Sequence, residues 1–269
     1  MAAADLGELD VVDEGTGVPV VLSHGGNSDR RYWEPQQAAF AARHRVITYS
    51  QRSTSPAEEA AESSTGGNAP PPDHVADLVA IIERLAAGPV HLVGFSSAIG
   101  LRTVLAAPAL IRSLTIIEPN LPWVLEGDPD GEAALAWWRA ENERVRVDAA
   151  GDDDRAAQLW FELVNNRGPG TFEAQPEAFR RMWRERFVSR RSTAATAVPL
   201  RCADLGRIGV PTLALGAEYG MPYSRAVLDR VAACIRGSTL VIVPDVSHFM
   251  SYQAPERFNE IVLDFIDRH

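Results

Sequence analysis

One serine of the chain lies where a hydroxyl group can act as a nucleophile. Residues Gly94-Phe95-Ser96-Ser97-Ala98 follow directly on the apolar run 90–93 and lead into a helix-like stretch over 99–107. A sharp turn between a buried strand and a helix exposes the hydroxyl to a substrate and aims the helix N-terminus at the oxyanion that forms. This arrangement indicates nucleophilic catalysis by Ser96.

A serine is a poor nucleophile at neutral pH, so it needs a base within hydrogen-bond reach. Four of the six histidines do not follow a strand. His269 is the last residue, His44 and His74 lie beside predicted helices, and His91 starts a predicted strand. His248 instead follows the apolar run 240–243 in a short loop. Ligands bind beyond the carboxyl ends of strands in open α/β sheets. We therefore predict His248 as the base.

The oxyanion requires hydrogen-bond donors. One is the backbone N–H of Ser97, at the helix N-terminus. The sequence His24-Gly25-Gly26-Asn27 follows the apolar run 18–22, and glycines there let backbone N–H groups approach a ligand closely. We predict Gly26 as the second donor and expect His24 to hold this loop by hydrogen bonding.

The elements that position these residues form a repeating pattern. Six short apolar runs predict strands over 18–22, 45–49, 90–93, 114–117, 210–215 and 240–243. Helical patterns predict helices over 32–43, 73–87, 97–107, 222–235 and 255–267. Apolar strands alternating with helices indicate an α/β fold, with a parallel sheet covered by helices on both faces. We expect an antiparallel hairpin over 8–15 and a surface loop over 63–72.

Between Pro119 and about Leu200 the strands stop and helical patterns cover 134–146, 153–165 and 176–192. Five of the six tryptophans lie there. We predict a helical cap domain over 121–199, inserted into a core domain formed by 1–120 and 200–269. Most of its aromatic residues should form the core of the cap. The residues expected to bind substrate above Ser96 are Asn27, Phe95, Trp123, Trp138 and Trp160.

The amino-acid composition excludes or disfavours several classes of reaction mechanism and binding site. The 269 residues are 46% hydrophobic and carry a net charge of −10, which fits a soluble globular protein and disfavours a nucleic-acid surface. All 26 basic residues are arginine, so lysine-dependent mechanisms are excluded. Cys202 and Cys234 lack partners at zinc-ligand spacing, and we expect both to be buried apolar residues. We expect no metal, no cofactor and no targeting or membrane segment, and therefore a cytoplasmic location.

Taken in order, these motifs resemble the α/β-hydrolase superfamily over nearly the whole chain. The resemblance rests on His24-Gly25-Gly26 with Trp33, the strand 46–49, the turn at Ser96, the cap and Ser247-His248-Phe249. It implies an eight-stranded, mostly parallel sheet, a lid inserted after strand six and a Ser-His-acid triad. Two departures occur. Ala98 stands where glycine is usual, and Ser50-Gln51-Arg52-Ser53-Thr54-Ser55-Pro56 replaces the family's Asp-x-Arg-Gly-x-Gly-x-Ser loop.

The resemblance leaves two candidates for the triad acid. The family's commonest position falls on Tyr219, which cannot serve as an anionic acceptor at neutral pH. Glu218 is one residue early. Glu118 follows the run 114–117, which is strand six in the order that the family resemblance implies. Certain lactone hydrolases and the haloalkane dehalogenases, which are similar, carry their acid at that point. Pro119 fixes the chain that leaves the strand. We favour Glu118 over Glu218.

The family resemblance implies a serine hydrolase that cleaves an ester, lactone or related carbonyl bond of a small hydrophobic molecule through an acyl-enzyme. The same residues suit cleavage of a C–C bond beside a ketone. Ser96 in place of aspartate argues against epoxide hydrolysis and dehalogenation. The alternatives are a cofactor-free perhydrolase (haloperoxidase) or lyase, and a catalytically silent ligand-binding protein. The expected partner is a small hydrophobic carbonyl substrate, without nucleic acid or membrane; the oligomeric state is open, with a homodimer as one alternative.

Overall fold

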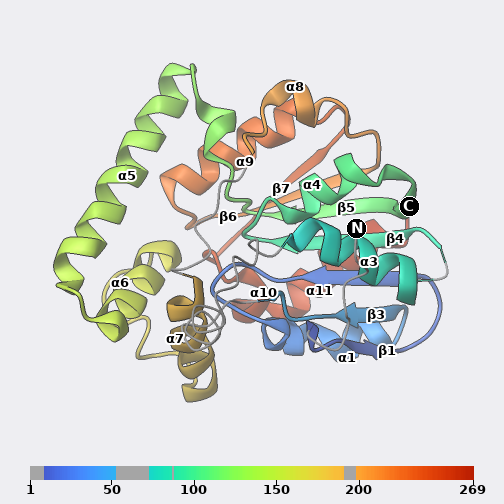
Figure 1. Cartoon of the computed structure of the whole chain (residues 1–269), viewed down its shortest axis with the longest axis horizontal. Helices are drawn as coiled ribbons and strands as arrows, with labels where there is room; N and C mark the ends of the chain where they lie inside the picture. The colour runs from blue at the N-terminus through green and yellow to red at the C-terminus, as the bar shows by residue number, and fades with distance from the viewer. Residues whose placement is uncertain (1–8, 53–72, 87, 191–197) are drawn as a thin grey trace, which may run out of the picture.

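The structure is a computed structural model of the chain, and it describes residues 9–52, 73–86, 88–190 and 198–269. Within these residues a seven-stranded sheet runs through the middle of the molecule (Figure 1). Its strands are β1 (Val12–Glu14), β2 (Pro19–Ser23), β3 (Arg45–Thr48), β4 (Val90–Phe95), β5 (Ile111–Ile117), β6 (Thr212–Ala217) and β7 (Thr239–Val243). They are arranged β1-β3-β2-β4-β5-β6-β7, and all neighbouring pairs are parallel except β1 with β3.

The described residues form seven strands of the mostly parallel sheet, for which the family resemblance implied eight. The hairpin expected over 8–15 is wrong for the described residues, because β1 pairs antiparallel with β3, Val12 opposite Thr48. The turn between β1 and β2 uses Gly15 and Gly17, with φ of 78° and 101°. A Cβ on Gly15 would lie 2.3 Å from the carbonyl oxygen of His44, so only glycine lets the chain pass this close to the start of β3.

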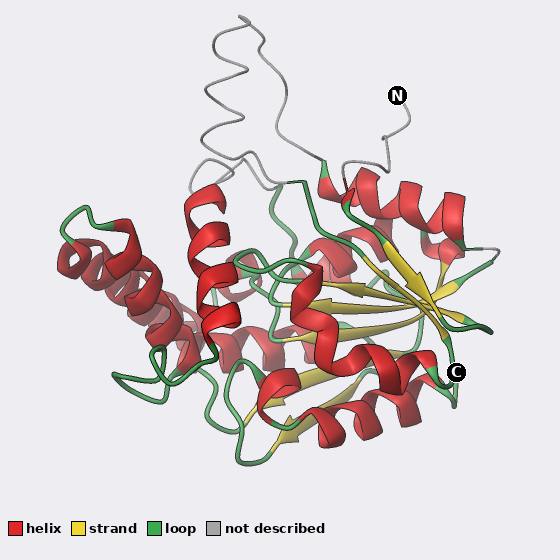
Figure 2. Ribbon diagram, turned by 90° about the horizontal axis from the view of Figure 1, so that it is seen from below, coloured by secondary structure: helices red, strands yellow, loops and turns green. Residues whose placement is uncertain are grey.

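Helices cover both faces of the sheet (Figure 2). Alternate residues of a strand point to opposite faces. Val20 and Leu22 pack on the side of α1 (Glu34–Ala41) and α11 (Pro255–Ile266). Val21 packs on the side of α3 (His74–Leu85), α4 (Ile99–Ala106) and α9 (Pro222–Cys234). Strands that are apolar on both faces therefore sit between two helical layers, as the sequence predicts.

Three of the helices that follow β5 and precede β6 stand at one end of the sheet (Figures 1 and 2). We call α5 (Pro129–Ala149), α6 (Asp153–Asn165) and α7 (Glu177–Arg190) the inserted helices. Asp128 caps α5 by accepting a hydrogen bond from the N–H of Gly131, and this starts the helix earlier than the expected 134. The inserted helices lie within the predicted cap, 121–199, but its separation as a domain stays a prediction.

Aromatic residues join the inserted helices to one another and to the loop after β7. Phe161 on α6 stacks on Phe249, which follows β7, with ring centroids 4.8 Å apart. The indole Nε1–H of Trp183 donates to the carbonyl oxygen of Ala157, which ties α7 to α6. The short helices of the described chain are η2 (Arg30–Trp33), η3 (Pro108–Leu110), η4 (Pro122–Leu125), α8 (Cys202–Leu205) and α10 (Met250–Gln253).

The two cysteines are not simply the buried apolar residues that we expected. Cys202 and Cys234 form a disulfide with their Cα atoms 5.1 Å apart. The bond joins α8 to the last residue of α9, and these two helices pack against each other. The two cysteines are 32 residues apart, so their pairing depends on this tertiary contact and has no local sequence signal.

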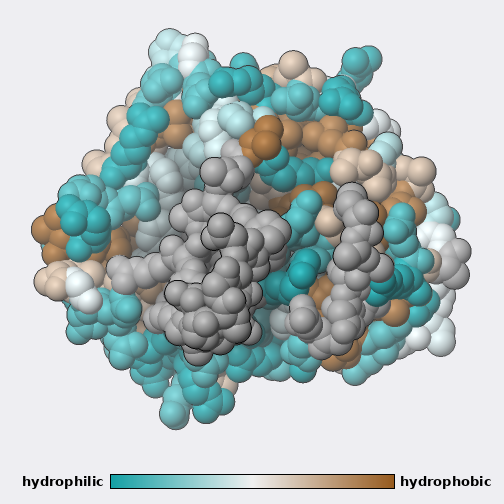
Figure 3. All heavy atoms as spheres, viewed as in Figure 1, coloured by the Kyte–Doolittle hydropathy of each residue, from teal (hydrophilic) through white to brown (hydrophobic). Residues whose placement is uncertain are grey.

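The outer surface is mostly hydrophilic on the face shown in Figure 3, where hydrophobic residues form separate groups among hydrophilic ones. None of the helices within the described ranges is long and apolar enough to span a membrane. The predicted surface loop over 63–72 lies outside the described residues.

Candidate active site

Ser96 occupies a strained turn between β4 and α4. β4 ends at Phe95, and Ser96 has a φ of 51°, in the left-handed region that non-glycine residues rarely adopt. Its N–H donates to the carbonyl oxygen of Ile117 at 2.9 Å, which holds the turn against β5. A Cβ on Gly94 would lie 3.8 Å from the Cα of Gly100, so the strand and the helix cross closely on either side of the turn. The backbone thus raises the serine out of the sheet.

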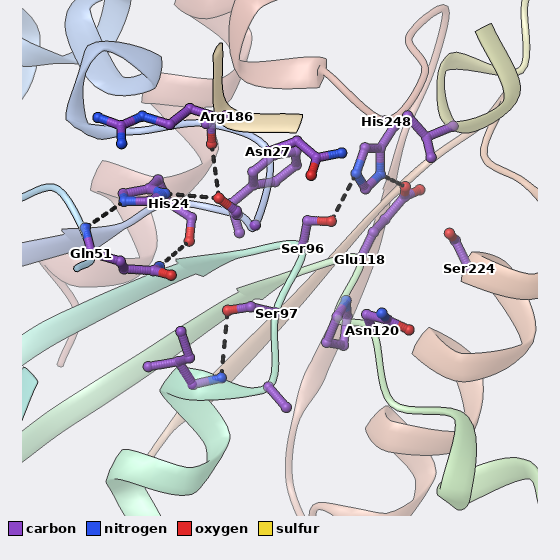
Figure 4. Close-up of a pocket in the computed structure, with 18 of the residues that line it drawn as sticks. His24, Asn27, Gln51, Ser96, Ser97, Glu118, Asn120, Arg186, Ser224 and His248 are labelled. Atoms are coloured by element: carbon purple, nitrogen blue, oxygen red, sulfur yellow. Dashed lines mark hydrogen bonds and ion pairs between the residues drawn. The ribbon is translucent and has the colours of Figure 1, made fainter. Parts of the chain in front are cut away.

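The structure brings Ser96, His248 and Glu118 into one hydrogen-bonded row (Figure 4). His248 Nε2 lies 3.0 Å from Ser96 Oγ, and His248 Nδ1 lies 2.6 Å from Glu118 Oε2. The His248 and Glu118 residues are 5% and 3% exposed, so water competes little for these contacts. A carboxylate on Nδ1 keeps the proton on that nitrogen and leaves Nε2 free to accept the serine proton.

Glu118 is held at both of its carboxylate oxygens. Its φ is 39°, and its N–H donates to the carbonyl oxygen of Leu215 on the neighbouring strand β6. Oε1 accepts the N–H of Ala217 at 2.9 Å, while Oε2 faces His248. A Cβ on Gly220 would lie only 2.6 Å from Oε1. The carboxylate therefore lies across the end of β6, in space that a side chain at position 220 would fill.

The other acid candidate faces elsewhere. Glu218 is exposed, and its Oε2 accepts the N–H of Asp245 at 2.8 Å. Tyr219 is 39% exposed, with the guanidinium of Arg167 4.2 Å from the centre of its ring. The histidine Nδ1 contact belongs to Glu118.

A polar cluster anchors the loop that carries His248, with Ser247 and Asn165 buried and Gln253 exposed. Ser247 Oγ donates to Asn165 Oδ1 at 2.5 Å, and the N–H of Ser247 donates to Gln253 Oε1 at 2.7 Å. Gln253 Nε2 also donates to Asn165 Oδ1. Asn165 ends α6, so an inserted helix helps to fix the position next to His248. Sequence reasoning missed Asn165 and Gln253, because Asn165 and Ser247 are 82 residues apart and no local motif links them.

The glycine loop after β2 runs beside the serine. A Cβ on Gly25 would lie 3.0 Å from the Cβ of Ser96, so a side chain at this position would crowd the serine and glycine suits the close approach. Gly26 is exposed and lines the pocket together with Ser97. Among the described residues, neither the N–H of Gly26 nor that of Ser97 donates a hydrogen bond to the protein. Both remain available to a ligand oxygen.

His24 braces this loop. Its Nδ1 lies 2.7 Å from the carbonyl oxygen of Gly25, and its Nε2 accepts the N–H of Gln51 at 2.9 Å. Burial lowers the pKa of His24 to about 4, so the ring is neutral at pH 7 and Nδ1–H donates to Gly25. Gln51 Nε2 in turn donates to the carbonyl oxygen of His24. The start of the unusual 50–56 loop thus supports the glycine loop, while positions 53–56 lie outside the described residues.

Asp29 connects the glycine loop to α7. It accepts hydrogen bonds from Arg31 Nε at 2.9 Å and from Arg186 Nε at 3.0 Å. Burial alone would raise the pKa of Asp29, but the hydrogen bonds from these two arginines outweigh it and hold the pKa at about 2. An ionised Asp29 therefore ties an inserted helix to the wall beside Gly26.

A pocket of about 400 Å³ opens above Ser96. Its lining includes every residue that the sequence predicts for substrate binding: Asn27, Phe95, Trp123, Trp138 and Trp160. Trp138 stacks on Tyr223 with ring centroids 4.7 Å apart and meets Trp160 edge to face. Tyr223 was not predicted and comes from α9. These rings give the pocket one aromatic wall.

Known proteins resemble the chain over nearly its full length. Residues 20–261 match the model of the "Alpha/beta hydrolase family". The chain is 35% identical to "Putative non-heme bromoperoxidase BpoC" of Mycobacterium tuberculosis, over 94% of this chain and 95% of that protein. It is 26% identical to "Putative carbamate hydrolase RutD" of Rhizobium rhizogenes, over 96% of each. The esterase EaEST from Exiguobacterium antarcticum superposes with a TM-score of 0.73 at 19% identity, over 96% of this chain and 95% of that one. The chain belongs to the α/β hydrolase family.

Proposed function

We propose that the chain is a serine hydrolase that cleaves an ester, lactone or related carbonyl bond of a small hydrophobic molecule through an acyl-enzyme. The row of hydrogen bonds from Ser96 through His248 to Glu118, at the base of an aromatic pocket, carries this proposal. A nucleophile, its base and the group that orients the base are the three parts that acyl transfer requires.

The reaction follows from these contacts. Ser96 Oγ attacks the substrate carbonyl while His248 Nε2 takes its proton, and Glu118 stabilises the imidazolium. The N–H groups of Gly26 and Ser97 bind the oxyanion. When the tetrahedral intermediate collapses, His248 returns the proton to the leaving alcohol, and Ser96 is left acylated. His248 then takes a proton from water as the water attacks the acyl-enzyme, and it returns that proton to Ser96 Oγ when the acid is released.

The test compares two adjacent serines. Ser96→Ala should lower kcat on 4-nitrophenyl esters by at least about 10⁴-fold and abolish labelling by a fluorophosphonate probe. Ser97→Ala is the matched control, because it removes a hydroxyl from the same turn but keeps the backbone N–H. It should retain activity within a few fold and label normally. Turnover and labelling that survive in Ser96→Ala would falsify the mechanism.

A second candidate activity is perhydrolysis, which the likeness to a protein named as a non-heme bromoperoxidase favours. Hydrogen peroxide would then replace water as the nucleophile toward the acyl-enzyme and release a peroxyacid. Ser96→Ala abolishes both reactions, so the substrates must separate them. Bromide oxidation that requires both peroxide and a carboxylate, at rates above ester hydrolysis, supports the perhydrolase; ester or lactone turnover alone supports the hydrolase. Ligand binding without turnover or probe labelling would support a silent binding protein instead.

A further inference from the structure

The pocket wall carries positive charge on a protein that is acidic overall. The chain has a net charge of −10. Yet the described pocket lining contains the three guanidinium groups of Arg52, Arg102 and Arg186 and a single carboxylate, that of Glu118, which faces His248. Since an acidic protein repels anions at long range, local cations are needed to hold an anionic ligand.

Two of the three arginines have a carboxylate partner behind the wall. Arg186 Nε lies 3.0 Å from Asp29 Oδ2. Arg52 Nε donates to Asp77 Oδ2 at 2.9 Å, and its Nη2 contacts the other oxygen of the same carboxylate. Both charges are balanced within the protein.

Arg102 differs from the other two. In the described ranges it has no carboxylate partner, and its hydrogen bond goes from Nη2 to the carbonyl oxygen of Val198. A guanidinium has five N–H donors, so one carbonyl leaves most of them unsatisfied by the described protein. The side chain is half-buried, and burial lowers the pKa of Arg102. A cation in this setting is stabilised by an anion that shares its site.

Its place in the fold puts Arg102 within reach of a substrate bound to Ser96. It lies one turn into α4, and this helix begins at Ile99, directly after the nucleophile turn. One turn rises about 5.4 Å. Arg52 and His74 line the pocket as well. α3 begins at His74 and packs against α4, the helix that carries Arg102. Trp138 and Tyr223 form the aromatic wall elsewhere in the pocket.

We infer that Arg102 binds a carboxylate group of the substrate, several bonds from the carbonyl that Ser96 attacks. The substrates would then be amphiphilic carbonyl compounds, with a carboxylate on one side of the scissile bond and an apolar group on the other. The inference rests on the proposed acyl transfer at Ser96 and specifies its substrate class.

The experiment uses substrate pairs that differ only in charge. In the first pair, 4-nitrophenyl hydrogen adipate carries a terminal carboxylate, and 4-nitrophenyl 6-methylheptanoate has an isopropyl group in its place. The second pair moves the carboxylate to the leaving group: 4-hexanoyloxybutanoate against 4-methylpentyl hexanoate, followed by pH-stat. We expect Arg102→Gln to lower kcat/KM for the anionic member of at least one pair by roughly 10- to 100-fold, the loss of a charge-assisted hydrogen bond. The neutral members should change less than threefold.

Two further variants separate recognition from structure. Arg102→Lys keeps the charge and should fall between wild type and Arg102→Gln on the anionic substrate. Arg112→Gln removes an exposed arginine of β5 that lies outside the pocket, and should leave both pairs unchanged. Equal losses on charged and neutral members, or no loss on any, would overturn the carboxylate site while ester hydrolysis by Ser96 stands. If wild type turns over none of the four esters and does not label with the fluorophosphonate probe, the proposed hydrolase itself fails.

Discussion

Replacing Glu118 with glutamine tests the proposed triad at the contact that sequence reasoning had least basis to choose. Glutamine has nearly the same shape as glutamate, but one of its two terminal groups is an NH2 donor. In the native site both oxygens of Glu118 accept hydrogen bonds, from the N–H of Ala217 at 2.9 Å and from His248 Nδ1 at 2.6 Å. A glutamine can satisfy only one of these donors.

Either orientation of the amide damages the site. If its oxygen accepts from Ala217, its NH2 faces Nδ1, and the imidazole must carry its proton on Nε2, where it cannot accept the proton of Ser96. If its oxygen faces Nδ1, the NH2 meets the N–H of Ala217, and two donors oppose each other. The comparable loss in a Ser-His-Asp triad is about 10⁴ in kcat, and we expect about 10³ to 10⁴ here, which corresponds to roughly 4 to 5.5 kcal/mol of activation free energy.

The assay is kcat on the best 4-nitrophenyl ester, with circular dichroism and a thermal midpoint to verify that the variant folds. Glu218→Gln is the matched control, because Glu218 is exposed and its carboxylate accepts the N–H of Asp245 outside the row. The control should keep kcat within about twofold. A folded Glu118→Gln enzyme with more than a tenth of wild-type activity, or a collapse of Glu218→Gln in its place, would refute the reasoning.

Three other changes test contacts around the site. Gly220→Ala places a methyl carbon 2.6 Å from Glu118 Oε1, so kcat should fall on the order of 10-fold with KM little changed, and an unaltered kcat would contradict the packing. Replacing Cys202 and Cys234 with alanine opens a loop of 32 residues and should lower the free energy of unfolding in urea by about 3.7 kcal/mol. Dithiothreitol should destabilise wild type to the same level and leave the double variant unaffected. The pKa of Asp29 is about 2 in the folded protein and 3.8 in the unfolded chain. The ionised carboxylate therefore contributes its full stability above pH 3.8, and this contribution is lost as the pH falls through 2. Asp29→Asn should therefore cost about 2 kcal/mol at pH 7 and flatten the loss of stability between pH 4 and pH 2; an acid limb like that of wild type would exclude this role.

The parallel part of the fold could be predicted because its strands carry a strong local pattern. β4 is buried at every position, which is typical of a strand covered on both faces. β1 has only three residues, none of them buried, so nothing in its sequence specifies a partner. Its pairing with β3 is decided by where Gly15 and Gly17 turn the chain.

The arrangement of the candidate site was predictable where residues lie near a strand end, and unpredictable where tertiary packing joins distant segments. Ser96 follows β4 directly, His248 lies in the short loop after β7, and parallel strands end at one edge of the sheet. Asn165 meets Ser247 only because α6 packs beside the loop after β7. In the sequence, Arg102 likewise has the pattern of an ordinary polar residue of an amphipathic helix. Only the structure shows that it lines the pocket.

The position of Glu118 shows why chain position is a weaker guide than geometry to the proposed acid. The family's commonest slot is at Tyr219, past the end of β6, whereas Glu118 follows β5, the neighbouring strand. Neighbouring parallel strands lie about 4.8 Å apart, a gap that a glutamate side chain spans. The N–H of Ala217 draws the carboxylate toward the end of β6, and Gly220 leaves room for it there. A carboxylate that follows either β5 or β6 can therefore reach the same point beside a histidine in the loop after β7. The condition is that the other strand end offers an N–H donor there and that no side chain occupies the space.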